Sequence, residues 1–131
     1  MIRTCSADPV TYVHHIADVP PCCPVSGNPR PGSTIAVRYR PAAGLVLPVE
    51  DLSAMVGQYV GGFGAVRAQE EMIQSIAARC AALVKVSVRV RADLVITPPD
   101  GGDDQRMVVT CRATPHPHSS ALQRQCGTAK W

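Results

Sequence analysis

Hydrophobic and polar residues alternate along residues 33–40, 84–96 and 105–113, and this period of two predicts β-strands. Residues 10–16 are predicted as a further strand, the first along the chain, because they are rich in β-branched and aromatic residues. A turn rich in Pro, Gly and Asp at 98–104 separates the last two stretches, so we expect them to form a β-hairpin.

Between the second and third of these strands, the apolar residues recur at helical spacing. Pro48 suits the start of a helix, and Glu50 and Asp51 favour its N-terminus. Glycines 61, 62 and 64 end this helix, and a second one is predicted over about 65–83. The order ββααββ predicts an α+β fold, with an antiparallel four-stranded sheet and two helices on one face.

The length of 131 residues fits one domain, which we place at residues 1–113. Residues 114–131 lack periodicity and are expected to form a flexible C-terminal tail. The predicted sheet has two open edges and one face that no helix covers. Assembly into an oligomer is the simplest way to cover them, so we expect a homo-oligomer.

The net charge of +3 comes from basic residues that are dispersed along the sequence. This dispersal argues against a dedicated DNA-binding surface, but leaves room for contact with a substrate carried by a nucleic acid. Arg38 and Arg40 would share one polar face with Arg89 and Arg91 if their strands pair. Such a face could hold a phosphate, or could simply be solvated.

No apolar stretch is long enough to span a membrane, and the N-terminus lacks the apolar core of a signal peptide. We therefore expect a cytoplasmic protein whose six cysteines are reduced. No C-x-x-C pair suggests structural zinc. Cys23 could form a metal site with two of the histidines, which are His14, His15, His116 and His118, but unrelated surface histidines are the preferred interpretation. We expect no metal and no cofactor.

Two features carry candidate chemistry. Cys22 and Cys23 stand at the start of a Pro/Gly-rich loop that leads into the second strand, where a thiolate could act as a nucleophile. Glu70 is predicted to continue the apolar stripe of the second helix, whereas Glu71 is expected on a solvated face. An inward carboxylate would await the N–H donors of a ligand, or Glu70 would lie close enough to the helix start to be hydrated.

These residues resemble the QueF family of tunnelling-fold (T-fold) proteins over about residues 10–97. The resemblance rests on Cys23-Pro24-x-Ser26-Gly27-Asn28-Pro29, on the strand ending Tyr39-Arg40-Pro41, and on Glu70. It implies a T-fold that assembles into a ring, of five or ten subunits, with the site between subunits. It also implies a 7-cyano-7-deazaguanine (preQ0) substrate, a thioimide formed on Cys23, and a ring-anchoring role for Glu70. Ser26 and Arg30 are the further candidate substrate-binding residues.

Two departures from the family pattern bear on the reaction. Where the reductases of the family carry an aspartate, this chain has Arg30 and Pro31. Where they carry a lysine-containing motif for NADPH, this chain has residues 50–55 without lysine. The sequence thus looks more like the QueF-like amidinotransferases, which add ammonia and give a formamidine, on a substrate that could lie within tRNA or DNA. The alternatives are an NADPH-dependent nitrile reductase, a metal-dependent cyclohydrolase-type T-fold enzyme, and a non-catalytic deazaguanine-binding subunit.

Overall fold

The computed structural model describes residues 2–6, 10–64 and 68–115. Its elements, in chain order, are β1 (Arg3–Thr4), β2 (Val13–Asp18), β3 (Thr34–Tyr39), β4 (Leu45–Val46), α1 (Val49–Gly57), α2 (Gln69–Val84), β5 (Val88–Ile96) and β6 (Gln105–Ala113). The predicted ββααββ order is confirmed. The short strands β1 and β4 pair with each other as a separate two-stranded sheet, which was not predicted.

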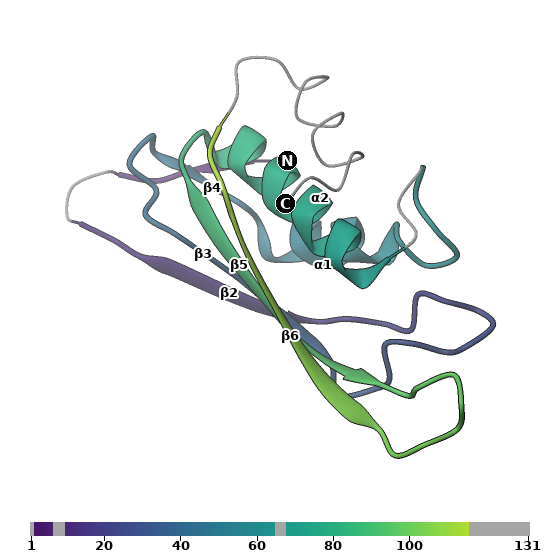
Figure 1. The fold of residues 1–131 in the computed structure, drawn as a ribbon. Helices are drawn as coiled ribbons and strands as arrows, with labels where there is room; N and C mark the ends of the chain where they lie inside the picture. Colours follow the sequence, from purple (N-terminus) through teal and green to yellow (C-terminus); the bar gives the residue numbers. More distant parts are fainter. Residues whose placement is uncertain (1, 7–9, 65–67, 116–131) are drawn as a thin grey trace.

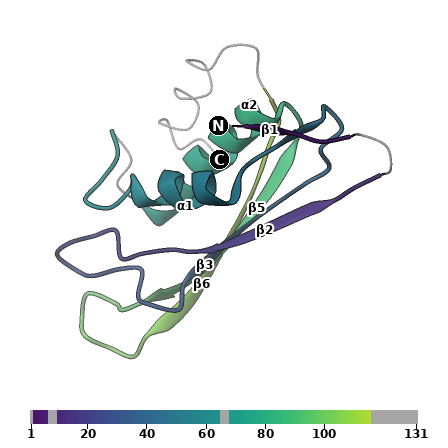
Figure 2. The ribbon, with the colours of Figure 1, turned by 180° about the vertical axis from the view of Figure 1, so that it is seen from behind.

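The main sheet has the strand order β2-β3-β5-β6, and every neighbouring pair is antiparallel. Both helices lie on the same face of this sheet (Figures 1 and 2). The predicted α+β layering is therefore confirmed. Because β3 pairs with β5 at the centre, the loop that follows β2 and the segment that follows β5 meet at one end of the sheet.

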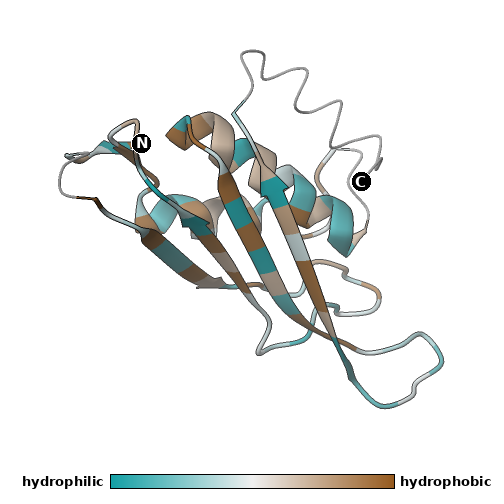
Figure 3. Ribbon diagram, turned by 60° about the vertical axis from the view of Figure 1, so that its left-hand side comes forward, coloured by the Kyte–Doolittle hydropathy of each residue, from teal (hydrophilic) through white to brown (hydrophobic). Residues whose placement is uncertain are grey.

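The core lies between the sheet and the helices, and the alternation along the strands produces it (Figure 3). Ile35 and Val37 of β3 and Leu94 of β5 are 0% exposed, and Val90 of β5 is 1% exposed. The helices contribute a matching set of buried residues, which includes Leu52, Val56, Ile73, Ile76 and Cys80. Each large aliphatic side chain buried here stabilises the fold by roughly 1.5–3 kcal/mol.

Helix α2 begins four residues later than the sequence indicated. The Ala68 N–H donates to the Glu71 carboxylate at 3.3 Å, so Glu71 closes the first turn instead of pointing into solvent. The face that follows Glu71 was expected to be solvated, but Gln74 and Ser75 are each only 8% exposed. That expectation was wrong because α2 is buried on more than one side.

The face of the main sheet opposite the helices is exposed on the described chain. It includes the large apolar side chains of Ile16 and Val108, which are 60% and 46% exposed. Neither described helix is long and apolar enough to cross a membrane. Residues 116–131 of the expected C-terminal tail lie outside the described residues. The tail therefore stays a prediction.

Candidate active site

The loop between β2 and β3 is held in a compact shape by its own backbone. The N–H groups of Cys22 and Cys23 both donate to the carbonyl oxygen of Asn28, at 2.9 and 3.0 Å. The Gly27 N–H donates to the Cys23 carbonyl at 2.7 Å, and Gly27 adopts a φ of 73°, which favours glycine. The Cys-Pro-x-Ser-Gly-Asn segment therefore folds into a tight turn that presents Cys23.

Side chains then anchor this turn to the end of β5. The Asn28 amide donates to the Thr97 carbonyl and its oxygen accepts the Thr97 N–H, each at 2.9 Å. Arg30 adds two contacts: its backbone N–H donates to the Val95 carbonyl at 2.7 Å, and its Nε donates to Thr97 Oγ1 at 2.7 Å. These hydrogen bonds therefore hold the cysteine loop against the end of the sheet.

Cys23 has the surroundings of a reactive thiol. The Ser26 N–H lies 3.4 Å from Cys23 Sγ, in hydrogen-bonding contact. The side chain of Ser26, followed by the backbone N–H groups of Ser26 and Val25, lowers the pKa of the Cys23 thiol. Hydrogen bonds to the sulfur favour the thiolate, which is the nucleophilic form.

Cys22, its neighbour, has the opposite surroundings. Its Sγ lies 3.3 Å from the Pro20 carbonyl and 3.8 Å from Met72 Sδ, and the residue is only 9% exposed. Burial raises the pKa of the Cys22 thiol. The two adjacent cysteines thus differ sharply: Cys22 packs as a small apolar residue, and Cys23 carries the more acidic thiol.

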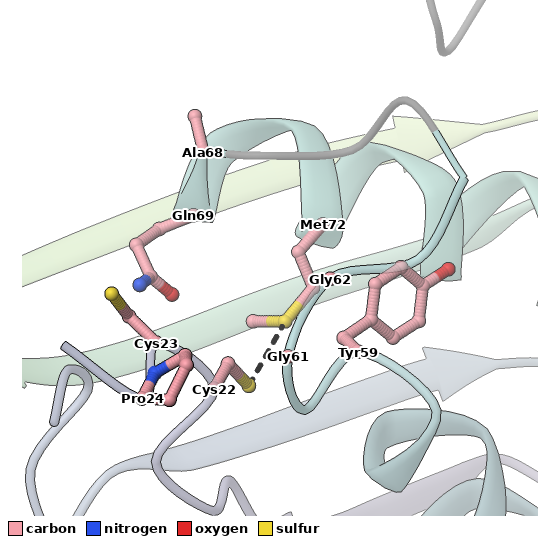
Figure 4. Close-up of a pocket in the computed structure, with 9 residues that line it drawn as sticks. All are labelled: Cys22, Cys23, Pro24, Tyr59, Gly61, Gly62, Ala68, Gln69 and Met72. Atoms are coloured by element: carbon pink, nitrogen blue, oxygen red, sulfur yellow. Dashed lines mark hydrogen bonds between the residues drawn. The ribbon is translucent and has the colours of Figure 1, made fainter.

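A hollow of about 190 Å³ opens beside the two cysteines (Figure 4). Its lining residues come from the cysteine loop, the turn after α1 and the start of α2; they are Cys22, Cys23, Pro24, Tyr59, Gly61, Gly62, Ala68, Gln69 and Met72. Typical pockets for drug-sized ligands span roughly 300–1,000 Å³. The hollow of this single chain thus suits a fragment such as one heterocyclic base.

Gln69 brings an unusual polar group to this hollow. Its Oε1 atom is buried and accepts no hydrogen bond within the part of the chain that the structure describes. Figure 4 shows the Gln69 carboxamide above Cys23 at the same end of the hollow. A buried acceptor without a partner costs about 1–3 kcal/mol, and the N–H of a ligand would recover this cost.

The far wall of the hollow is built by the turn that follows α1. The Gly61 N–H donates to the Cys22 carbonyl at 2.7 Å, which ties this turn to the cysteine loop. Tyr59 bonds to Ser75 at 2.6 Å through its hydroxyl, and Arg79 lies 5.0 Å from the centre of the Phe63 ring. The glycine run that the sequence marked only as a helix breaker therefore forms part of the site.

None of the three predicted substrate-binding residues, Ser26, Arg30 and Glu70, lines the hollow. Glu70 lies exposed in the first turn of α2, which agrees with the alternative that it is hydrated at the helix start. Helical geometry turns Gln69, one residue earlier, to the hollow instead. Arg30 is engaged with Thr97 behind the loop, which gives it a positioning role.

Ser26 lies next to the nucleophile but is exposed. Its hydroxyl oxygen accepts the Asn28 N–H at 3.2 Å, while its own N–H contacts Cys23. Ser26 therefore stabilises the turn and lowers the pKa of the Cys23 thiol. Gln69, Tyr59 and Gly61 were missed by the sequence reasoning, since nothing in their spacing distinguishes them from structural residues.

The histidines of β2 point to opposite faces of the sheet. His14 is exposed on the outer face, and His15 is half-buried, with its pKa lowered by burial. In the described ranges, no three His, Cys, Asp or Glu side chains gather as metal ligands would. His116 and His118 lie outside those ranges.

Comparison with known proteins adds no relative to this picture. No protein-family model, no curated protein and no solved structure matches this chain. The residues around Cys23 are thus the evidence on which an assignment of function depends.

Proposed function

We propose that this chain is a T-fold enzyme that captures the nitrile of a 7-cyano-7-deazaguanine on Cys23. The observation that carries the proposal is the pairing, in the lining of one small hollow, of Cys23, whose thiol has a lowered pKa, and Gln69, whose buried Oε1 accepts no hydrogen bond from the described residues. The ββααββ order with both helices on one face is the arrangement expected of a T-fold unit. The loop residues Cys23 to Pro29 support the same family.

The first chemical step is the addition of the Cys23 thiolate to the nitrile carbon. A C–S bond forms, one π bond of the C≡N group opens, and the nitrile nitrogen takes up a proton to give a thioimide. A thiolate is the strong, soft nucleophile that a protein can offer near neutral pH, and a nitrile carbon is a soft electrophile. The Ser26 contacts favour the thiolate that this step consumes.

Recognition of the ring is assigned to Gln69. A deazaguanine edge carries N–H donors, and the Gln69 Oε1 atom is a buried acceptor to which no described residue donates. A hydrogen bond between them would orient the nitrile toward sulfur, since Gln69 and Cys23 both line the hollow. Glu70 is exposed beside it, where a second copy of the chain in a ring would complete its surroundings.

For the fate of the thioimide we propose attack by ammonia. Ammonia adds to the thioimide carbon, the C–S bond breaks, and Cys23 leaves as a thiolate, so a nitrile and one ammonia together give a formamidine. No hydride donor is consumed. Helix α1, which spans the position of the reductases' lysine-containing motif, offers no basic residue in its last turn. Arg30, at the position of the missing aspartate, is engaged by Thr97 and is a poor general acid.

Intact-mass measurement after incubation with preQ0 tests the capture step. We expect a mass increase equal to one preQ0 molecule, which Cys23→Ala abolishes and the matched control Cys22→Ala retains. No adduct on the wild-type protein, under conditions where a reductase homologue forms one, would overturn the proposal. Binding without an adduct would indicate a deazaguanine-binding subunit instead.

A second measurement decides the fate of the adduct. With ¹⁵N-labelled ammonium we expect a labelled formamidine product and no loss of NADPH absorbance. Consumption of NADPH on addition of preQ0 would replace the amidinotransferase by a nitrile reductase. Stoichiometric zinc in the purified protein, with turnover that depends on it, would point to a cyclohydrolase-type enzyme.

A further inference from the structure

The outer face of the main sheet gathers basic residues that are far apart in the sequence. The strand register places His14 opposite Arg38, Arg38 opposite Arg89, and Arg89 opposite Arg112. These four residues, which we call the basic row, cross the whole sheet from β2 to β6. Arg91 lies on the same face, two residues from Arg89. The prediction that Arg38, Arg89 and Arg91 share one face if their strands pair is therefore confirmed.

The basic row is uncompensated within the described chain. Like charges directly opposite each other on a sheet are destabilising, yet Arg89 has an arginine on both sides. Asp93, on the same face, is bound by Arg106. None of the other arginines of this face, which are Arg38, Arg89, Arg91 and Arg112, makes an ion pair with a described carboxylate. The row thus presents exposed positive charge, which counterions screen in the free protein and an anionic partner would neutralise.

The shape of this face suits an extended polyanion. The row lines a groove of about 760 Å³ together with small and polar side chains that include Thr34, Ala36 and Thr110. Adjacent strands lie about 4.8 Å apart, so four strands spread the row over about 14 Å. Phosphates on one nucleic-acid strand advance about 3.4 Å each, so this length faces about four of them.

We propose that the basic row binds the phosphodiester backbone of a nucleic acid. Guanidinium groups bind phosphate oxygens in pairs, and a row of them matches successive phosphates. Tyr12 directly precedes β2, two residues from His14, and is 77% exposed, so it can stack on an unpaired base. A single strand is therefore the favoured ligand, and this inference stands independently of the chemistry at Cys23.

Fluorescence anisotropy with a labelled 20-nucleotide single strand, as DNA and as RNA, tests the proposal between about 50 and 300 mM salt. We expect the logarithm of the affinity to fall with the logarithm of salt concentration, with a slope of about −2.8 when the four arginines of this face, Arg38, Arg89, Arg91 and Arg112, each neutralise one phosphate. Arg89→Gln should weaken binding at least fivefold and reduce the magnitude of the slope by about 0.7. The double variant Arg38→Gln/Arg89→Gln should abolish binding at 150 mM salt.

Arg3→Gln is the matched control, because it removes the same charge from β1, outside the main sheet. It should leave the affinity within twofold. Equal losses in Arg3→Gln and Arg89→Gln, or a slope near zero, would overturn the proposal. Binding of poly-glutamate in place of either oligonucleotide, with the same loss in Arg89→Gln, would assign the face to an acidic protein segment instead.

Melting temperatures, measured with and without the single strand, keep the test decisive if a variant is poorly folded. Arg89→Gln removes the repulsion on both sides of the central position, so the melting temperature of the free protein should rise. The single strand should raise the melting temperature of the wild type and leave that of the double variant unchanged. A fall on Arg89→Gln would show that the row is not under charge strain and would count against a missing anionic partner.

Discussion

Asn28 and Thr97 are joined by two hydrogen bonds that link the cysteine loop to the end of β5. The Asn28 Nδ2 donates to the Thr97 carbonyl and the Thr97 N–H donates to Asn28 Oδ1, both at 2.9 Å. The Asn28 carbonyl meanwhile accepts from both Cys22 and Cys23. Asn28 thus holds the loop together through its backbone carbonyl and anchors the loop to β5 through its side chain. The position of Cys23, the candidate nucleophile, therefore depends on Asn28.

Asn28→Ala should therefore loosen the loop and destabilise the protein. Loss of the side chain leaves the Thr97 backbone groups without these partners, at a cost of about 1–3 kcal/mol. Urea denaturation measures this cost, and the rate of Cys23 alkylation reports the loop. Ser53→Ala, at an exposed position of α1, is the control and should change the stability by less than about 0.5 kcal/mol. Equal stability of the two variants would contradict the anchoring role.

The two neighbouring thiols should titrate apart. Alkylation by iodoacetamide follows the thiolate, so the midpoint for Cys23 should fall below the ordinary pKa of 9.0 and that for Cys22 above it. Peptide mapping by mass spectrometry at several pH values assigns each modification. Ser26→Ala should move the Cys23 midpoint upward, and Ser26→Thr, which keeps a hydroxyl, should restore it. A higher midpoint for Cys23 than for Cys22 would refute the assignment.

Gln69→Met should separate stability from binding. Replacing the buried unpartnered oxygen with an apolar side chain of similar length removes a desolvation cost, so the free protein should keep or gain up to about 2 kcal/mol. Binding of preQ0, measured by calorimetry with Cys23→Ala as background, should fall at least tenfold. Glu70→Gln, at the exposed neighbouring position, should have the smaller effect. The reverse order would return ring recognition to Glu70.

Stability should fall at alkaline pH because of Cys80. Burial raises the pKa of this thiol to about 12, whereas the unfolded chain ionises near 9.0. Above pH 9 the unfolded state therefore binds fewer protons than the folded state, and unfolding becomes easier as pH rises. Between pH 9 and 11 the loss should reach about 2–3 kcal/mol. Urea denaturation over this range measures it, and Cys80→Ala should flatten the slope whatever its effect at pH 8.

The periodic parts of the fold could be predicted from the sequence because burial on one face imposes a regular spacing. Ile35 and Val37 on β3 illustrate this for a strand, and Ile73 and Ile76 for a helix. Strands β1 and β4 could not be predicted, since two residues show no period. The same limit applies to the start of α2, which depends on the contact between Glu71 and Ala68 rather than on a pattern.

The candidate site was predictable only where its chemistry lies in one segment. The loop around Cys23 carries its own turn signals, and the structure surrounds this thiol with hydrogen-bond donors. Gln69 and Gly61 join the site through tertiary packing, which spacing does not encode. The basic row likewise depends on register between strands, and a shift of one residue would turn Arg89 to the core.

Strand β5 also sets a distance. Arg89 lies near its start, and Thr97, which holds the cysteine loop through Asn28, directly follows its end. Eight residues of extended chain cover about 27 Å. The sheet therefore fixes the separation, measured along β5, between the basic row and the cysteine loop. Because the row crosses the strands, a single strand bound along it runs across β5 and not toward the thiol, so binding on this face and chemistry at Cys23 can change independently.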